Sequence, residues 1–154
     1  MISKSKSDPA ITHYGDERIL PFLSWIRRIM VQKLKKNTDT IFVHNLTSIQ
    51  ELTSRSSVII APNHVCYWDS CLYFLLSHQV SPRSFVFVAQ ETLKRLPFLR
   101  WCGSLPINRR STKKAVQQLM QSKNLNTAPT QFWIFPQGEH RPAHARPLGF
   151  KKGV

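Results

Sequence analysis

The chain has 154 residues, of which 42% are hydrophobic and 19% charged, a balance typical of a globular domain and unlike that of a disordered protein. Its 22 Lys and Arg against 8 Asp and Glu give a formal net charge of +14, which favours polyanionic partners such as nucleic acid, anionic lipid surfaces or phosphorylated substrates. No secretory signal and no apolar run of about 18 residues is present, so we expect no segment that crosses a membrane.

The first 36 residues fall into two parts. Residues 1–17 are polar and rich in Ser and Lys, and we expect them to form a flexible tail. Residues 18–36 have apolar side chains at helical spacing and basic side chains opposite, which predicts a basic amphipathic helix with Trp25 near its border. Two interpretations stay open: a surface helix packed on the domain, or a membrane-surface helix lying in a lipid interface.

Residues 37–154 alternate strand-like with helix-like segments and are expected to form one domain. Apolar runs predict strands at 40–44, 58–61, 84–89 and 131–135, with a short extended element at 103–109. Helices are predicted at about 69–79 and 112–123, with a turn or short helix at 46–52 and two helical pieces separated by Pro97 at 91–101. This alternation indicates a layered α/β fold in which a mainly parallel or mixed sheet is flanked by helices.

A histidine and an aspartate lie five positions apart between the strand at 58–61 and the next helix. His64 follows Pro62, which ends the strand, and Asp69 could open the helix as its N-cap. A carboxylate that accepts a hydrogen bond from one imidazole nitrogen leaves the other nitrogen basic, and such a pair can take the proton of a substrate hydroxyl. The alternative is that Asp69 is only a helix cap and His64 a loop histidine bonded to backbone.

The three cysteines do not form a recognisable metal or disulfide pattern. Cys66, Cys71 and Cys102 contain no CxxC pair, and their odd number argues against a disulfide framework. His64 together with Cys66 and Cys71 lacks a fourth ligand at zinc-finger spacing, so we expect no metal site.

In a parallel sheet, sites form where loops leave the carboxyl ends of the strands. The loops after Ala61, around Arg109 and after Phe135 are therefore expected to be three walls of one pocket.

Three motifs occur in a fixed order within residues 40–154. The first runs from Asn63-His64 to Asp69 and has the form HX4D, the second is Gly103 to Arg109, and the third is Phe135-Pro136-Gln137-Gly138, followed by Phe150-Lys151-Lys152-Gly153. With these motifs the chain resembles the glycerolipid acyltransferase family, whose members acylate lysophosphatidic acid (1-acylglycerol-3-phosphate) and related lysophospholipids.

The resemblance implies an O-acyltransferase that needs no cofactor and uses acyl-CoA or acyl-carrier protein as donor. It implies that His64 is the general base and Asp69 its partner, and that Arg109 holds the phosphate of the lysophospholipid acceptor. From the residues alone, Arg109 could equally be a solvated charge and Gly138 only a tight turn. The resemblance also assigns the following residues to substrate binding: Gly103, Pro136, Gln137, Gly138, Glu139 and Arg141.

Two departures from the family pattern keep a second interpretation open. Gln137 stands where the family usually has Glu, with Glu139 and Arg141 as nearby substitutes, and the sequence stops at Val154 where the resemblance leads us to expect a further strand and a fourth, apolar motif. The chain could then be an inactive or truncated member that acts as a basic lipid-binding module. In either case we expect a peripheral protein on the cytoplasmic face of an anionic membrane.

Nucleic acid is not expected as a partner. The sequence has no helix-turn-helix, aromatic-sheet or zinc signature. Its four tryptophans lie mostly in apolar runs, where core packing is the default expectation. They are Trp25, Trp68, Trp101 and Trp133.

Overall fold

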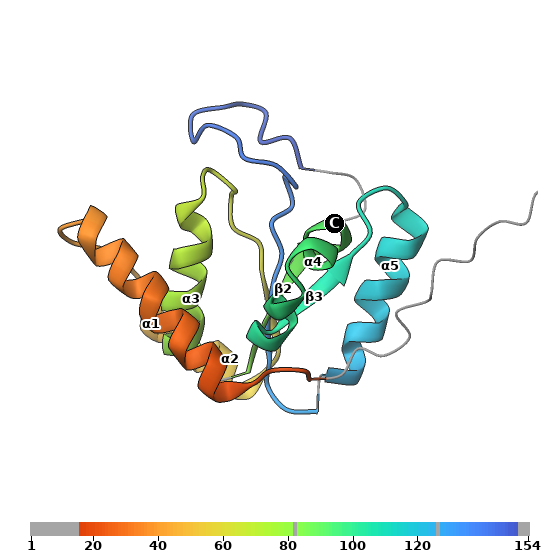
Figure 1. The fold of residues 1–154 in the computed structure, drawn as a ribbon, viewed down its shortest axis with the longest axis horizontal. Coiled ribbons are helices and arrows are strands. Elements are labelled where there is room, and N and C mark those ends of the chain that lie inside the picture. The colour runs from red at the N-terminus through yellow and green to blue at the C-terminus, as the bar shows by residue number, and fades with distance from the viewer. Residues whose placement is uncertain (1–15, 82, 126, 151–154) are drawn as a thin grey trace, which may run out of the picture.

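The computed structural model describes residues 16–81, 83–125 and 127–150, so most of the predicted tail at 1–17 lies outside the described residues. In this part of the chain four parallel strands form one sheet in the order β1-β4-β2-β3 (Figure 1). The strands are β1 (Val58–Ile60), β2 (Ser84–Ala89), β3 (Ser104–Ile107) and β4 (Gln131–Trp133). The predicted α/β fold is confirmed.

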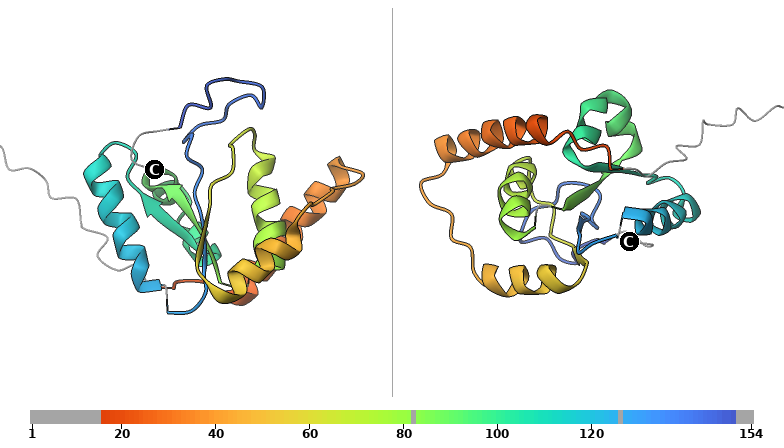
Figure 2. Two further views of the ribbon diagram at one scale, coloured as in Figure 1. Left: turned by 180° about the vertical axis from the view of Figure 1, so that it is seen from behind. Right: turned by 90° about the horizontal axis from the view of Figure 1, so that it is seen from below.

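Helices cover both faces of this sheet, with α1 and α3 on one side and α5 on the other (Figures 1 and 2). The α-helices are α1 (Leu20–Asn37), α2 (Leu46–Arg55), α3 (Trp68–Val80), α4 (Gln90–Arg95) and α5 (Thr112–Gln121). Two 3-10 helices complete the described part, η1 (Pro97–Cys102) and η2 (Ser122–Leu125). The predicted break at Pro97 is confirmed, because α4 ends just before it and η1 begins there.

The two faces of β2 belong to two different cores, because successive side chains of a strand point in opposite directions. Phe85 and Phe87 pack with β3, α5 and Phe132. Val86 and Val88 pack on the other face with side chains of α3 and of α1, including Phe22. The continuously apolar sequence of β2 therefore follows from its central position and from helices on both sides.

The segment between α1 and α2 contradicts one prediction. Residues 40–44 were expected to form a strand, but in the described structure they have no regular secondary structure and pair with no other strand. The Phe42 side chain is 81% exposed. A β-branched and aromatic run stabilises a strand only when it packs on a pleated neighbour, and this run has none.

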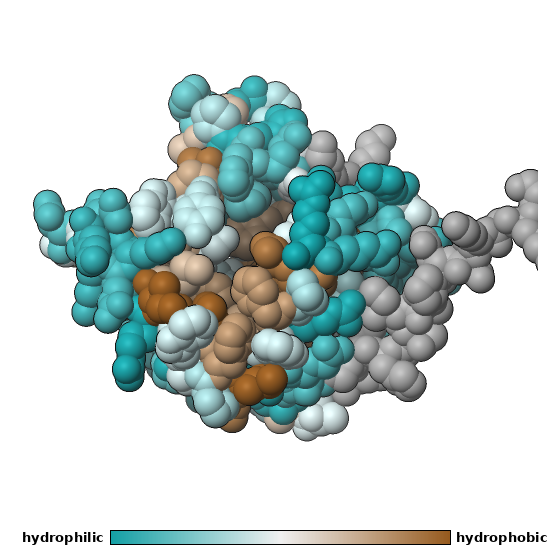
Figure 3. Space-filling view, in the orientation of Figure 1, coloured by the Kyte–Doolittle hydropathy of each residue, from teal (hydrophilic) through white to brown (hydrophobic). Residues whose placement is uncertain are grey.

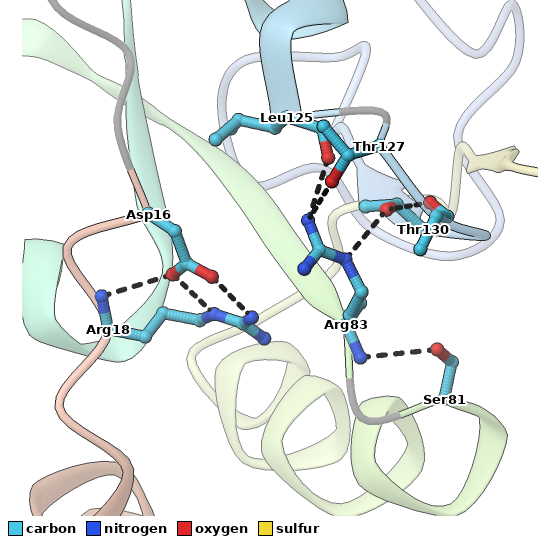
Figure 4. A network of polar contacts seen from close by, with 8 residues as sticks. Asp16, Arg18, Ser81, Arg83, Leu125, Thr127 and Thr130 are labelled. Carbon is cyan, nitrogen blue, oxygen red and sulfur yellow. Dashed lines mark hydrogen bonds and ion pairs between the residues drawn. The ribbon is translucent and has the colours of Figure 1, made fainter.

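Polar side chains join the segments that meet at the amino ends of β2 and β4 (Figure 4). Arg18 lies just before α1, is 7% exposed and binds the Asp16 carboxylate through Nε at 2.7 Å and Nη2 at 2.6 Å. Its guanidinium also lies over the Phe85 ring, 4.7 Å from the ring centre. Arg83 donates to the Leu125 carbonyl at 2.8 Å and to the Thr130 hydroxyl at 3.3 Å. These contacts hold α1 and the α5–β4 connection on this edge of the sheet.

No helix in the part of the chain that the structure describes combines the length and the apolar character needed to cross a membrane.

Candidate active site

The loop from β1 to α3 carries the predicted histidine and aspartate. Pro62 has no amide hydrogen to donate, which is consistent with β1 ending at Ile60. The helix α3 begins with Tyr67 as its N-cap residue and without a side-chain cap, and Asp69 lies in its first turn. The prediction that Asp69 is the N-cap is therefore wrong, and its carboxylate bonds to the preceding loop instead.

Asp69 binds the His64 ring and the loop backbone with the same oxygen. Its Oδ2 lies 2.8 Å from His64 Nδ1 and accepts the backbone N–H groups of Val65 at 2.7 Å and Cys66 at 3.0 Å. Because a carboxylate oxygen accepts this bond, the proton of a neutral His64 ring resides on Nδ1 and the lone pair on Nε2. Among the described residues none hydrogen-bonds to Nε2. The pair has the arrangement of a general base with its orienting carboxylate.

Two rings from the third motif and the residues after it enclose the His64 imidazole. The Phe135 ring lies 4.6 Å away between ring centres, at an angle of 36°. The His140 ring meets His64 edge-on at 4.2 Å. The hydrogen bond from Ile134 N to Ile60 O, 3.0 Å long, joins the ends of β4 and β1 and so brings these loops together. The His64 side chain remains 20% exposed, so part of it is accessible to solvent.

The His64 backbone is fixed from both sides by the segment after β4. Its N–H donates to the Gln137 side-chain oxygen Oε1, and its carbonyl accepts the Arg141 N–H at 2.8 Å. Gln137 Nε2 donates to the Leu148 carbonyl at 3.0 Å. One partner of Gln137 is a donor and the other an acceptor, so the chemistry itself fixes the orientation of the amide. Gln137 is 2% exposed and connects the histidine loop to residue 148.

The Arg109 side chain extends from the loop after β3 to the turn at 136–138. Its Nη1 donates to the Gly138 carbonyl, and the side chain is otherwise exposed. The turn that leads to it is shaped by Asn108, whose Oδ1 accepts the N–H groups of Arg110 at 2.9 Å and Ser111 at 3.0 Å. Gly138 has a φ of 67°, a left-handed conformation that glycine adopts without strain. The structure thus brings together the three loops that were expected to form one pocket.

The other sequence-predicted binding residues have different surroundings. Pro136 is buried, and the Arg141 guanidinium pairs with Glu139 at 2.8 Å, so these two charges partly neutralise each other. Gly103 does not join the site. It ends η1 at the amino edge of β3, with a φ of 82°, and a Cβ there would meet the Ser84 carbonyl oxygen at 2.9 Å. Glycine is therefore needed at position 103 for close packing. The residue lies at the amino edge of the sheet, whereas His64 lies at the carboxyl edge.

Sequence reasoning missed His140 and the ring contact of Phe135. Nothing in the spacing of His140 pointed to the site, because the position of residue 140 depends on the turn at 136–138 and on the bond from Arg141 N to His64 O. Phe135 was assigned to a strand, whereas β4 ends at Trp133 and Phe135 lies beyond it. The Pro136-Gln137-Gly138 turn directly after Phe135 is the one sequence signal that could have placed the Phe135 ring beside the β1–α3 loop.

The three cysteines are free. Burial raises the pKa of the Cys102 thiol to about 11 and also raises that of Cys71. Cys66 is half-buried, and its Sγ lies 4.0 Å from Asp69 Oδ1. Within the described residues, no group of three or more His, Cys, Asp and Glu side chains is arranged to hold a metal ion.

Comparison with known families adds an independent observation to this geometry. A family model described as Acyltransferase matches residues 40–154, which is most of the chain and includes all three motifs. The chain belongs to the acyltransferase family. Comparison with curated proteins and with solved structures gives no match.

The matched segment of this acyltransferase contains His64, Asp69, Arg109 and Gln137, together with the whole sheet. The helix α1 and the buried Arg18 precede it. The parts of the site described above thus all belong to the acyltransferase domain.

Proposed function

We propose that this acyltransferase moves a fatty acyl group from acyl-CoA or acyl-carrier protein to the hydroxyl of a lysophospholipid such as 1-acylglycerol-3-phosphate. The observation that carries the proposal is the His64–Asp69 pair, 2.8 Å between Nδ1 and Oδ2, inside a domain of the acyltransferase family. The HX4D motif and the two later motifs that resemble glycerolipid acyltransferases support the choice of a lysophospholipid acceptor.

In the proposed reaction, His64 Nε2 takes the proton of the acceptor hydroxyl as its oxygen attacks the thioester carbonyl carbon. A C–O bond forms and the carbonyl oxygen becomes negatively charged. When the carbonyl re-forms, the C–S bond breaks, and the proton held on His64 passes to the leaving thiolate. Asp69 stabilises the positive charge that His64 carries between these steps. No covalent acyl-enzyme and no cofactor are required.

Arg109 is the proposed ligand of the acceptor phosphate. Its guanidinium donates one bond to the Gly138 carbonyl, which holds it near the His64 loop, while the exposed remainder offers further N–H donors to an anion. Gly138 and Arg141 contribute backbone to the same rim, whereas the amide of Gln137 is used within the protein. Lysophospholipids reside in bilayers, so we propose that the enzyme works as a peripheral protein at an anionic membrane surface.

The test measures free thiol released from a long-chain acyl-CoA in the presence of detergent and a panel of lysophospholipids. The parent protein should release thiol only when an acceptor is added, and His64→Ala should reduce the rate by about 10²- to 10⁴-fold. His44→Ala is the matched control, because His44 is exposed and lies outside the site, in the segment between α1 and α2. Arg109→Ala should chiefly raise the KM for a phosphate-bearing acceptor.

The outcomes separate the parts of the proposal. Full activity in His64→Ala would exclude the base mechanism. Acceptor-independent thiol release would indicate a thioesterase, and the absence of any release from folded protein would favour a lipid-binding member without activity. A change in kcat alone for Arg109→Ala would exclude the phosphate assignment.

A further inference from the structure

Two tryptophans that the sequence placed among apolar neighbours lie at the surface. The Trp25 side chain on α1 is 57% exposed and the Trp101 side chain on η1 is 43% exposed, whereas Trp133 in β4 is buried as expected. Burying an indole ring is strongly favourable, so two half-exposed indoles close together need a physical reason. Single exposed apolar residues need none, but a contiguous group of them marks an interaction surface.

These side chains form one continuous cluster. Phe22 lies between the two tryptophans, with its ring centre 5.7 Å from that of Trp25 and 5.4 Å from that of Trp101. Phe98 joins from η1 at 6.2 Å, and the Ile19 N–H donates to the Trp101 carbonyl at 3.0 Å. We call Phe22, Trp25, Phe98 and Trp101 the aromatic face.

The aromatic face is in contact with the hydrophobic core. Phe22 is half-buried and packs against the core on the α1–α3 side of the sheet, so the exposed rings adjoin a ring that the core supports. Leu96, which is also exposed, lies at the start of η1 and adds apolar area beside Phe98 in the chain. Figure 3 shows apolar side chains gathered between α1 and the α4–η1 segment, with hydrophilic side chains around them.

Most of the charged side chains on and beside the elements that carry the aromatic face are basic. The helix α1 contains five basic residues and no acidic one, and the exposed ones include Arg28, Lys35 and Lys36. In the adjoining α4, Lys94 and Arg95 are exposed and so is one acidic residue, Glu91, while Arg100 on η1 pairs with Glu17 at 3.5 Å. The charge around the rings is therefore predominantly positive and complements a surface of anionic headgroups.

We propose that the aromatic face docks on an anionic lipid bilayer, with Trp25 and Trp101 inserted at the level of the headgroups and the basic side chains on the lipid phosphates. Indole rings favour this interfacial layer because one end is apolar and the ring N–H can stay hydrated. A second copy of the chain fits the face poorly, because a symmetric dimer would bring two positively charged surfaces together. The inference rests on the proposed function in that a lysophospholipid acceptor would be met at the same bilayer.

The first experiment is co-sedimentation of the protein with vesicles. The parent should bind phosphatidylcholine vesicles that contain phosphatidylglycerol and bind pure phosphatidylcholine weakly. Trp25→Ala combined with Trp101→Ala should weaken binding to the anionic vesicles by at least about tenfold. Phe42→Ala is the matched control, because Phe42 is an exposed aromatic residue outside the face and its loss should leave binding unchanged.

A second measurement does not depend on how well the alanine variant folds. Tryptophan emission of the parent should be quenched by anionic vesicles whose acyl chains carry bromine. The quenched fraction should fall in Trp25→Phe and in Trp101→Phe, which keep an aromatic ring, and should not fall in Trp133→Phe, whose indole is buried. Absence of quenching in the parent would overturn the proposal, as would equal vesicle binding by the parent and the double variant. A dimer that the double variant loses would instead assign the face to a second copy.

These results are distinguishable from a failure of the proposed function. His64→Ala should bind vesicles like the parent while losing acyl transfer. The double tryptophan variant should keep transfer to acceptors dispersed in detergent and lose it on vesicles. Vesicle binding without any acyl transfer would support the docking surface and contradict the proposed activity. Acyl transfer without vesicle binding would support the proposed activity and contradict the docking surface.

Discussion

The two edges of the sheet each hold a carboxylate bound to a basic side chain, but the two pairs differ in how the basic side chain is used. At the amino edge, Arg18 binds Asp16 with two nitrogens (Figure 4). Its guanidinium also lies over the Phe85 ring. At the carboxyl edge, His64 binds Asp69 through Nδ1 alone. Through its contact with Phe85, Arg18 joins the segment before α1 to the sheet, whereas Nε2 of His64 is the atom that we propose as the base.

The difference follows from the chemistry of the two side chains. A guanidinium has only donors and stays protonated, so a buried Arg18 is stable when protein acceptors take those donors. A neutral imidazole has one donor and one acceptor, so binding Asp69 uses the donor and leaves the acceptor Nε2 available. The pair at the amino edge is therefore suited to a structural role, and the pair at the carboxyl edge to the catalytic role that we propose for it.

The largest expected effect is that of Asp69→Asn on catalysis. The amide oxygen can still accept the N–H groups of Val65 and Cys66, but the negative charge that stabilises protonated His64 is lost. Acyl transfer should fall by about 10²- to 10⁴-fold while the free energy of unfolding changes by about 1 kcal/mol or less. Thiol release and thermal unfolding on the same samples measure both quantities. Transfer within threefold of the parent would contradict the role of Asp69.

Arg18→Leu should have the opposite profile. It removes two charge-assisted hydrogen bonds and the contact with Phe85, and we expect the free energy of unfolding to fall by about 2–3 kcal/mol. The activity of the folded fraction should stay unchanged, because Arg18 lies at the edge of the sheet away from His64. Urea unfolding gives the first quantity and transfer per folded molecule the second. Arg18→Lys, which keeps the charge but not the two-nitrogen geometry, should be intermediate, and loss of activity in fully folded Arg18→Leu would argue against separate roles for the two edges.

Gln137 lies at the carboxyl edge like His64, but both ends of its amide are bonded within the protein. Gln137→Glu keeps an acceptor for the His64 N–H but places a second oxygen against the Leu148 carbonyl. We expect faster amide hydrogen exchange in residues 139–150 and a fall in kcat of about tenfold, with a smaller change in KM. Gln137→Ala removes both bonds and should affect the two quantities more strongly. A change confined to KM would instead indicate that the amide binds acceptor directly.

Much of this fold could be predicted from the sequence because its central elements have unambiguous patterns. The strand β2 was predicted with its observed bounds, since a run apolar on both faces fits a central parallel strand. The strand predicted at 40–44 could not be excluded from the sequence, because these residues have a high β propensity. The structure differs because no neighbouring strand pairs with them. Trp25 was predicted near the border of its helix, but its proximity to Trp101 could not be predicted, because it depends on how α1 and η1 pack together.

The candidate site was partly predictable as well. The convergence of the loops that carry His64, Arg109 and Gln137 follows from parallel strands ending at one edge. The internal use of the Gln137 amide could not be anticipated, because Leu148 lies eleven positions further along the chain, after a segment without regular structure. Gly103 was associated with the site by its motif, although the length of β3 separates it from Arg109.

The smallest expected effect is a pH dependence of stability at the amino edge. The hydrogen bond from the Arg18 side chain is the main cause that lowers the pKa of Asp16, and it outweighs the opposing effect of partial burial. A carboxyl group whose pKa is lower in the folded protein than in the unfolded chain adds stability above its ordinary pKa and loses it as the pH falls toward the folded value. Because the carboxylate is partly exposed, this contribution should be only about 0.5–1 kcal/mol.

Asp16→Asn removes that contribution and so isolates it. The free energy of unfolding of the parent should exceed that of the variant by a constant amount from about pH 7 to about pH 5, and the difference should shrink below about pH 4 as Asp16 of the unfolded parent takes up a proton. Urea unfolding at a series of pH values measures it. A difference that persists unchanged at the lowest pH would mean that Asp16 acts through its shape and hydrogen bonds, and that the charge of this pair contributes nothing to holding the segment before α1 on the sheet.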